Sequence, residues 1–336
     1  MSILVTGAAG FIGFSLAARL LAAGKAVVGV DNLSPYYDVS LKRARLAILE
    51  RQPGFRFVQI DLADRAAAGL LFGAERFETI VHLAAQAGVR HSIDQPMGYV
   101  DANLVGFAHI VEGARGQQTP HLLFASSSSV YGGLNKLPFA ETDRVDHPFS
   151  LYAATKRANE LVAHSYAHLY GLPCTGLRFF TVYGPWGRPD MALFKFTRGI
   201  LAGEELPVFN HGRMVRDFTY IDDAVEAVMR LIALPPEAGM AGRSEEYETD
   251  APYRIFNIGN NQPIELLDYI RTLEKHLGRP ARLEMLPMQP GDVPVTMADM
   301  RRLERVTGFR PTTTVDAGIK RFVEWYLGYF AIGARS

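Results

Sequence analysis

The segment TGAAGFIG, residues 6–13, constrains the fold of this chain more than any other part of the sequence. It follows an apolar run at residues 3–7 and opens a helical pattern at residues 11–24, so its glycines stand where a strand gives way to a helix. Gly7 permits a tight turn, Gly10 lets the backbone approach a pyrophosphate, and Gly13 allows close packing of the helix on the strand. The free N–H groups of such a helix start attract phosphates. The segment therefore predicts a dinucleotide-binding unit, with Phe11 and Ile12 in the same site.

The acidic residue that ends the next strand pattern indicates which dinucleotide this unit would bind. Asp31 lies about 20 residues after the turn, where a carboxylate can accept both hydroxyls of a ribose, and Asn32 follows it. A 2′-phosphate at this position would meet a like charge, so the sequence favours NAD over NADP as the cofactor. Small or polar residues at the ends of the third and fourth strand patterns are expected to complete the site: Asp61, Leu62, Leu83, Ala84 and Ala85. Tight core packing is an alternative explanation for the two alanines.

The first half of the chain alternates short apolar runs with helical patterns. Continuous apolar strands separated by helices are typical of a parallel sheet that is covered on both faces. The right-handed crossover rule then predicts an α/β fold with a doubly wound parallel Rossmann sheet. After residue 178 the pattern loosens and Pro, Gly and Trp cluster. We therefore predict an NAD-binding domain at residues 1–178 and a smaller mixed α/β lobe for the substrate at residues 179–336, partly interwoven with the first.

Composition narrows the class of partner. The chain has 336 residues and a formal net charge of zero, which argues against a nucleic-acid or anionic-membrane partner, because both usually require a basic excess. Its one cysteine, Cys174, excludes an internal disulfide and favours a reducing compartment. The uncharged N-terminal run contains three glycines and lacks a cationic start, so we expect no targeting segment and a cytoplasmic protein. No metal site is expected.

Tyr152 and Lys156 stand four residues apart in SLYAATKRANE, the pattern of the first turns of a helix. Positions i and i+4 share a helix face, so the phenol and the ammonium are expected to be neighbours. Nearby positive charge favours the phenolate, and lowering its pKa by about 3 units takes about 4 kcal/mol. A phenolate can accept the proton of a substrate hydroxyl while a hydride leaves the same carbon. A surface Tyr–Lys pair is the alternative interpretation of this motif on its own.

Further motifs strengthen the catalytic interpretation. Ser127 ends a strand pattern at the carboxyl edge of the predicted sheet, where open α/β folds bind ligands, and is placed to hydrogen-bond the reacting hydroxyl. Together with TGAAGFIG, Asp31, HLAA and YAATK, the segment SSSSVYG resembles the extended short-chain dehydrogenase/reductases, in particular their nucleotide-sugar epimerase and dehydratase branch. The resemblance covers nearly the whole chain. It implies a catalytic set of Ser127, Tyr152 and Lys156.

The resemblance carries further expectations for the same site. It implies that Lys156 holds the nicotinamide ribose and that Asn103 supports the geometry of the active-site helix. It also implies a homodimer formed through helices that flank the sheet, with the apolar stretches at residues 102–112 and 160–170 as candidates. Core packing is an equally good account of those stretches.

The residues around the catalytic set indicate which reaction this branch member would perform. Ser128 and Ser129 stand where dehydratases carry Asp and Glu, and decarboxylases typically carry Glu at the second position. Thr181 stands where galactose-type epimerases have Asn, and Arg188 follows shortly. Hydroxyl donors and a fixed cation make a receptor for a carboxylate. The combination resembles the UDP-glucuronate 4-epimerase group, which implies NAD-dependent C4 epimerisation of UDP-glucuronate to UDP-galacturonate through a 4-keto intermediate.

Alternatives remain at this stage. A neutral UDP-glucose/UDP-galactose 4-epimerase is the next candidate, followed by a UDP-glucuronate decarboxylase, and a binding module without turnover belongs to a different class. Arg188 could form a surface salt bridge, and Ser128 and Ser129 could serve only turn chemistry.

The nucleotide end of the substrate site is expected from resemblance alone. Arg216 would contact the diphosphate, with Arg213 as a weaker candidate, and Asp292 would meet the ribose of the nucleotide. Gln289 departs from the arginine that galactose-type epimerases commonly have, so one phosphate contact is expected to be missing. Arg90 could touch the substrate, and a structural salt bridge is the alternative for it.

Overall fold

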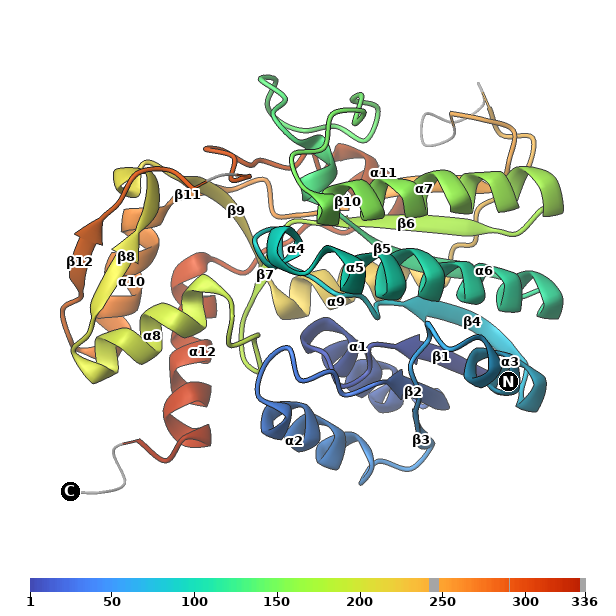
Figure 1. Cartoon of the computed structure of the whole chain (residues 1–336), viewed down its shortest axis with the longest axis horizontal. Coiled ribbons are helices and arrows are strands. Elements are labelled where there is room, and N and C mark those ends of the chain that lie inside the picture. The colour runs from blue at the N-terminus through green and yellow to red at the C-terminus, as the bar shows by residue number, and fades with distance from the viewer. Residues whose placement is uncertain (242–247, 290, 333–336) are drawn as a thin grey trace.

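The computed structural model describes residues 1–241, 248–289 and 291–332. A seven-stranded sheet forms the centre of the molecule, with the strand order β10-β6-β5-β4-β1-β2-β3 (Figure 1). Every neighbouring pair in this sheet is parallel, so the predicted doubly wound Rossmann sheet is confirmed. The strands are β1 (Ser2–Thr6), β2 (Val27–Asp31), β3 (Phe55–Gln59), β4 (Phe77–His82), β5 (Leu122–Ser127), β6 (Cys174–Phe179) and β10 (Tyr253–Ile258).

Both faces of this sheet are buried under helices, which explains why the strand sequences are continuously apolar. Alternate residues of β1 enter different cores: Ile3 and Val5 join the cluster that contains α1 and α9, whereas Leu4 joins the cluster on the opposite face. The covering helices are α1 (Phe11–Ala22), α2 (Val39–Leu49), α3 (Arg65–Ala74), α6 (Gly106–Gln117), α7 (Leu151–Tyr170), α9 (Ile221–Ile232) and α11 (Arg301–Thr307). Burial of both faces leaves no polar face on the inner strands, whereas the edge strand β3 exposes Arg56 and Gln59.

A smaller lobe lies to one side of the sheet, at the left of Figure 1. It contains a three-stranded sheet of β11 (Pro263–Glu265), β9 (Val215–Tyr220) and β7 (Thr181–Tyr183), and a parallel pair of β8 (Glu205–Val208) and β12 (Arg282–Met285). Its helices are α8 (Ala192–Ala202), α10 (Leu266–Leu277) and α12 (Val315–Tyr329). This mixed α/β arrangement is the kind of lobe that the sequence predicts.

The second half of the chain also contributes to the large sheet. Strand β10 pairs with β6 at the sheet edge, and α9 packs on α1. The predicted division at residue 178 therefore remains a prediction about domains, with elements from both sides of it in one sheet.

Short helical turns carry the connections that approach the site. They are α4 (His91–Asp94), α5 (Pro96–Tyr99), the π-helical turn η1 (Val100–Val105), and the 3₁₀ turns η2 (Ser128–Tyr131) and η3 (Phe209–Gly212). Three of them, α4, α5 and η1, follow one another between β4 and α6, beside α7. They bring the end of β4 close to the helix that carries Tyr152.

The described ranges contain neither a candidate membrane span nor a candidate metal site. None of their helices is both long enough and apolar enough to cross a membrane. Within the same ranges, no group of three or more His, Cys, Asp or Glu side chains could hold a metal ion.

Candidate functional site

The glycine turn has the geometry that a dinucleotide phosphate requires. Gly7 has φ +71°, a conformation that favours glycine, and a Cβ at Gly13 would lie 2.1 Å from the carbonyl oxygen of Gly7. Gly10 caps α1 without any side-chain hydrogen bond, so the first N–H groups of the helix point free at the carboxyl edge of the sheet. Phe11 and Ile12 form the first turn of this helix. Glycine at position 13 therefore lets α1 pack closely on the turn, and the free N–H groups at the start of this helix fit a bound pyrophosphate.

Asp31 ends β2 beside this cradle and is almost fully buried. Its Oδ2 accepts a hydrogen bond from the Ala9 N–H at 3.1 Å, and its Oδ1 accepts one from the Leu33 N–H at 2.8 Å. Lys42 from α2 brings its ammonium within 3.8 Å of the same carboxylate. Each carboxylate oxygen retains acceptor capacity, so Asp31 fits the two hydroxyls of an adenosine ribose.

The residues expected near the adenine end also gather at this edge. Asn32 donates to Asp61 Oδ2 at 3.0 Å, and together they line an open surface hollow with Ser34, Pro35, Gln59 and Ile60. Leu62 is buried, and its carbonyl oxygen lies 2.8 Å from the ring nitrogen Nδ1 of His109. The structure therefore brings Asn32 and Asp61 together at the point where the sequence places the end of the cofactor.

The end of β4 packs directly against the glycine turn. The N–H groups of Leu83 and Ala84 each donate to the Thr6 hydroxyl at 3.1 Å, and a Cβ at Gly7 would lie 2.8 Å from the Ala84 nitrogen. Glycine is therefore required at position 7 by packing, and Ala84 and Ala85 are half-buried beside the turn. Burial lowers the pKa of His82 to about 3, so this residue at the end of β4 stays neutral.

The helix of the Tyr–Lys pair begins where the sequence predicts. Ser150 caps α7 by accepting a hydrogen bond from the Ala153 N–H at 3.1 Å, which is a standard helix start. Lys156 is buried and its Nζ donates to the Ala125 carbonyl oxygen at 2.9 Å. Burial lowers the pKa of Lys156 to about 8. The helix and β5 are therefore joined by one buried ammonium.

Opposing effects act on the pKa of Tyr152. Burial raises the pKa of its phenol, whereas a hydrogen bond with Ser127 and the positive charge of Arg188 lower it. The sequence predicts Lys156 as the cation that favours the phenolate; in the structure that ammonium donates to Ala125 and the cation acting on Tyr152 is Arg188. The Ser127 hydroxyl and the charge of Arg188 therefore both favour the phenolate, against the effect of burial.

The serine cluster at the end of β5 serves both as a turn and as a set of hydroxyls. Ser127 caps η2 by accepting a hydrogen bond from the Ser129 N–H at 3.2 Å, and its hydroxyl donates to Ser129 Oγ at 3.1 Å. Ser128 and Ser129 are half-buried. The predicted turn chemistry is present, and the hydroxyls remain within reach of a ligand at Tyr152.

Asn103 links the loop after β4 to the helix of Tyr152. Its side chain donates to the Gln86 carbonyl oxygen and to Thr155 Oγ1, both at 3.0 Å, and accepts from the Gln86 N–H at 2.8 Å. Thr155 belongs to α7, between Tyr152 and Lys156. This buried amide therefore holds the loop after β4 by two contacts and the active-site helix by one.

Arg188 is paired within the protein. Its Nε donates to Asp190 Oδ1 at 3.0 Å, its Nη2 also engages Asp190, and Nη2 donates to the Ala87 carbonyl oxygen at 3.3 Å. The Tyr36 hydroxyl donates to the same Asp190 at 3.2 Å. Among the described residues none engages Nη1 of Arg188, so one edge of the guanidinium remains for another acceptor. The salt-bridge alternative from the sequence is therefore present, together with room for a ligand.

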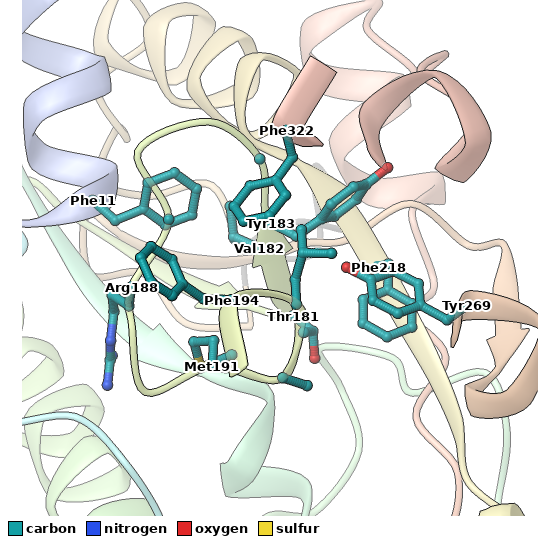
Figure 2. Close-up of a pocket in the computed structure, with 14 residues that line it drawn as sticks. Phe11, Thr181, Val182, Tyr183, Arg188, Met191, Phe194, Phe218, Tyr269 and Phe322 are labelled. Atoms are coloured by element: carbon teal, nitrogen blue, oxygen red, sulfur yellow. The ribbon is translucent and has the colours of Figure 1, made fainter. Parts of the chain in front are cut away.

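Figure 2 shows Arg188 and Thr181 at the margin of an aromatic cavity. The cavity has a volume of about 30 Å³ and is lined by rings that include Phe11, Phe194 and Phe322. This volume holds about one water molecule, so the cavity is a packing space behind the site, too small for a sugar. The Arg188 side chain extends away from the rings, and the Thr181 hydroxyl lies at the edge of the group (Figure 2).

Three residues expected at the nucleotide end of the substrate lie together. Arg90 Nη2 lies 2.9 Å from Asp292 Oδ2. Burial lowers the pKa of Arg216, while the charge of Asp292 raises it and that of Arg90 lowers it. Arg216 also donates to the Val215 and Pro294 carbonyl oxygens at 3.0 Å. The salt-bridge alternative for Arg90 is thus present as well, and its partner is another predicted substrate residue.

The remaining residues of the predicted nucleotide end make fewer contacts. Arg213 is exposed, and its carbonyl oxygen accepts from Asn210 at 2.8 Å. Gln289 Oε1 is buried without a partner among the described residues. Pro290 of the same motif lies outside the described residues.

The sequence interpretation missed several residues of this region. Lys42 and Arg45 point inward from α2: Lys42 approaches Asp31, and Arg45 bonds the Ala9 carbonyl oxygen. Asp190 pairs with Arg188 and also accepts from Tyr36. The Tyr99 ring packs edge-on against the Tyr152 ring, with 6.1 Å between the ring centroids. The three-residue spacing of Lys42 and Arg45 places them on one helix face, which was a usable signal. In an amphipathic helix such residues are normally assigned to solvent, so the signal was weak.

Comparisons with known proteins agree with this geometry. The profile of the NAD dependent epimerase/dehydratase family matches residues 3–259. A probable UDP-glucuronate 4-epimerase of Rhizobium meliloti (strain 1021) is 54% identical over 330 residues, which cover 97% of both chains. The UDP-glucuronate 4-epimerase 4 of Arabidopsis thaliana is 47% identical over 336 residues, covering 98% of this chain and 76% of the plant protein.

A solved structure shares the fold over nearly the full length. The UDP-glucuronic acid 4-epimerase of Bacillus cereus, in complex with UDP-glucuronic acid and NAD, superposes with a TM-score of 0.87 at 31% sequence identity. The match covers 98% of this chain and 100% of the Bacillus chain.

Proposed function

The chain belongs to the NAD dependent epimerase/dehydratase family, and we propose that within this family it is an NAD-dependent isomerase that interconverts UDP-glucuronate and UDP-galacturonate. The observation that carries this proposal is the group of hydroxyls and one guanidinium around Tyr152. Ser127 bonds the phenol, Ser129 bonds Ser127, and Arg188 is close enough to lower the Tyr152 pKa. This set suits the carboxylate of a uronate. The similarity to proteins named UDP-glucuronate 4-epimerase supports the same choice.

The chain's own residues fit NAD as the cofactor. The glycine turn would hold the pyrophosphate, Asp31 the adenosine ribose, and Lys156 the nicotinamide ribose. When bound, NAD⁺ supplies an acceptor for one hydride from C4 and a donor that returns it.

In this mechanism Tyr152 moves the proton and the protein returns to its starting state. The C4 hydroxyl gives its proton to the Tyr152 phenolate as the C4 hydrogen leaves as a hydride, which produces a 4-keto sugar. The keto sugar turns its other face to the site, and the same hydride and proton return to C4 and to its oxygen. Oxidation and reduction balance, so no outside oxidant is consumed. Ser127 orients the reacting hydroxyl and the phenol throughout.

The uronate makes one further demand on the residues. A 4-keto uronate is a β-keto acid, and it loses CO₂ when the breaking bond aligns with the ketone π system. We assign Thr181, Ser127 to Ser129 and Arg188 to hold the carboxylate out of that alignment. The fixed guanidinium of Arg188, anchored by Asp190 and Tyr36, is suited to this because it cannot follow the carboxylate as the sugar turns.

A neutral UDP-hexose 4-epimerase is the second candidate function. The pairing of Arg188 with Asp190 favours it, because a guanidinium that is already neutralised attracts a carboxylate less strongly. Thr181 and the serines would then bond neutral hydroxyls. The free Nη1 edge of Arg188 and the similarity to uronate epimerases favour the first candidate. A decarboxylase is a third candidate, and a binding module without turnover is the least supported because Ser127, Tyr152 and Lys156 are all present.

We also propose a homodimer through α6 and α7. These helices lie side by side on one face of the molecule (Figure 1), and α7 exposes Leu161, Leu169 and Tyr170 by more than half of their surface. Such apolar side chains on adjacent helices suit burial against a second copy. Light scattering should give twice the monomer mass, and Leu161→Glu with Leu169→Glu should reduce it to the monomer. A cytoplasmic location accompanies the proposal, since the single cysteine, Cys174, suits a reducing compartment.

A labelled substrate tests the proposed reaction directly. UDP-glucuronate carrying deuterium at C4 is incubated with the purified protein, and the product is analysed by mass spectrometry and NMR. The proposal predicts UDP-galacturonate with deuterium still at C4, because the hydride returns to the carbon that it left. Exchange of the label with solvent would contradict the mechanism, and the absence of galacturonate would contradict the function.

A further inference from the structure

Arg45 lies outside the groups that the proposed reaction uses, yet it is the largest fully buried side chain in the described part of the chain. Its exposed fraction is 0%. Its guanidinium donates to the Ala9 carbonyl oxygen and to the Tyr37 hydroxyl, both at 2.8 Å. It also donates to the carbonyl oxygens of Trp186 at 2.6 Å and Gly187 at 3.3 Å. One side chain therefore joins three segments that are far apart in sequence.

Burying a guanidinium costs desolvation free energy. Desolvation lowers the pKa of Arg45, and none of its hydrogen bonds to described residues goes to a carboxylate. The nearest offsets are the Asp31 charge and the Tyr37 ring, 5.8 Å from the guanidinium carbon. An apolar side chain of similar volume would avoid this cost if packing were the only requirement. The presence of an arginine at position 45 is therefore explained by its hydrogen bonds and not by packing alone.

The segments that Arg45 joins belong to the two halves of the site. Ala9 lies in the glycine turn, and its N–H donates to Asp31. Trp186 and Gly187 immediately precede Arg188. A guanidinium presents its donors in one rigid plane, so acceptors bonded to it keep fixed relative positions. A shift of the glycine turn is thus transmitted to the loop of Arg188 by a single planar group.

We propose that Arg45 is a positioning residue that couples occupancy of the cofactor turn to the placement of Arg188. The proposal rests on the proposed function insofar as Arg188 holds a uronate. Filling the turn fixes Ala9 and, through Arg45, the Trp186–Gly187 backbone, so that Arg188 is in place before the sugar is oxidised. Binding of cofactor and of uronate is then mutually favourable, as linkage requires.

The test uses the full-length protein with three variants. Arg45→Lys keeps a charge but loses the planar set of donors, and Tyr37→Phe removes one acceptor with little change of shape. Arg43→Met is the control, because Arg43 is exposed on the same helix. Equilibrium dialysis gives the NAD dissociation constant with and without UDP-glucuronate, and NMR gives the fraction of pentose product.

The expected result is specific to coupling. UDP-glucuronate should tighten NAD binding by about 5-fold or more in the wild type and in Arg43→Met, and this gain should vanish in Arg45→Lys and shrink in Tyr37→Phe. The pentose fraction should rise in Arg45→Lys, and adding Arg188→Met should raise it no further than Arg188→Met alone. An unchanged gain in folded Arg45→Lys, or additive effects on pentose, would overturn the proposal. If Arg45→Lys does not fold, Tyr37→Phe provides the test: a smaller gain in NAD affinity than in the wild type supports the proposal, and an unchanged gain overturns it.

Failure of the proposed function would look different. Wild-type protein would then make no galacturonate, whatever the state of Arg45. The dialysis arm without sugar still decides in that case: weaker NAD binding in Arg45→Lys than in Arg43→Met supports the link to the cofactor turn, and equal binding overturns it.

Discussion

Lys156 Nζ lies 2.9 Å from the carbonyl oxygen of Ala125, so the helix of Tyr152 is bonded to the strand that ends at Ser127. Ala125 lies two residues before Ser127, on the same face of the strand, and Lys156 follows Tyr152 by about one helical turn. The contact therefore sets the distance between the phenol and the serine hydroxyl. In this arrangement Lys156 acts on Tyr152 through geometry, and Arg188 acts on it through charge.

Replacing Tyr152 with Phe should abolish turnover while leaving the fold intact, because the ring packing against Tyr99 is kept and only the hydroxyl is lost. Loss of a general base costs about 10²–10⁴-fold in rate. The measurement is the absorbance of reduced nicotinamide after UDP-glucuronate is added, beside UDP-glucuronate affinity by calorimetry. Reduced nicotinamide in Tyr152→Phe at the wild-type rate would rule out Tyr152 as the base.

The pH dependence of the rate should report the groups around Tyr152. The base is active only when deprotonated, and Arg188 and Ser127 both lower the pKa of Tyr152. Removing either group raises that pKa, so less phenolate is present at a given pH and the rising limb of kcat/KM moves to higher pH. We expect a shift to higher pH for both Ser127→Ala and Arg188→Met. Arg188→Lys should shift less than Arg188→Met, and identical profiles for all three variants would contradict this electrostatic account.

Replacing Arg188 with Met, or Thr181 with Val, should raise the fraction of decarboxylated pentose product, because the uronate carboxylate is then free to align with the 4-keto group. The product ratio is measured by NMR after complete conversion of UDP-glucuronate. Arg198→Met is the control, since Arg198 is exposed on α8. Unchanged product ratios together with normal UDP-glucuronate binding would remove Thr181 and Arg188 from this role.

The glycine turn offers a matched pair of substitutions. In Gly13→Ala the new Cβ would lie 2.1 Å from the Gly7 carbonyl oxygen, so the turn must shift. We expect the free energy of unfolding to fall by about 1–3 kcal/mol and NAD binding to weaken. Gly69 lies inside α3 with nothing within 4 Å of its added Cβ, so Gly69→Ala should gain about 0.5–1 kcal/mol. Urea unfolding gives both values. Equal stabilities of the two variants would show that the turn is not tightly packed.

Asp31 should determine the preference between NAD and NADP. Asp31→Ser removes a carboxylate that repels a 2′-phosphate. Lys42, which lies 3.8 Å from this carboxylate in the wild type, would then attract the 2′-phosphate. The ratio of NAD to NADP affinity should fall by at least about 10-fold, the equivalent of about 1.4 kcal/mol. Fluorescence titration with each reduced cofactor measures the ratio, and the exposed Asp94→Ser serves as the control. An unchanged ratio would mean that other groups select the cofactor.

The parts of the fold that depend on local patterns were predictable from the sequence. Continuous apolar strands, the glycine spacing from Gly7 to Gly13 and the helix start in SLYAATKRANE each depend on a few neighbouring residues, and each appears in the structure as expected. The i, i+4 relation of Tyr152 and Lys156 also follows from helix geometry alone.

Contacts across the topology could not be predicted in this way. Arg45 and Trp186 are separated by 141 positions, and Arg90 and Asp292 by 202. Whether a cation meets a carbonyl, a carboxylate or solvent depends on which loops converge at the sheet edge, and no local pattern encodes this. The pairing of Arg188 with Asp190 is close in sequence, but neighbouring opposite charges form ion pairs too inconsistently to be assigned without the structure.

The central claim is that the site is built for a uronate, and product analysis by NMR tests it most directly. The purified protein is incubated with UDP-glucuronate and, separately, with UDP-glucose. The account predicts UDP-galacturonate from the first and no UDP-galactose from the second. Galactose from UDP-glucose would make this a neutral-sugar epimerase with Arg188 serving only its salt bridge to Asp190, and pentose as the main product of UDP-glucuronate would make it a decarboxylase.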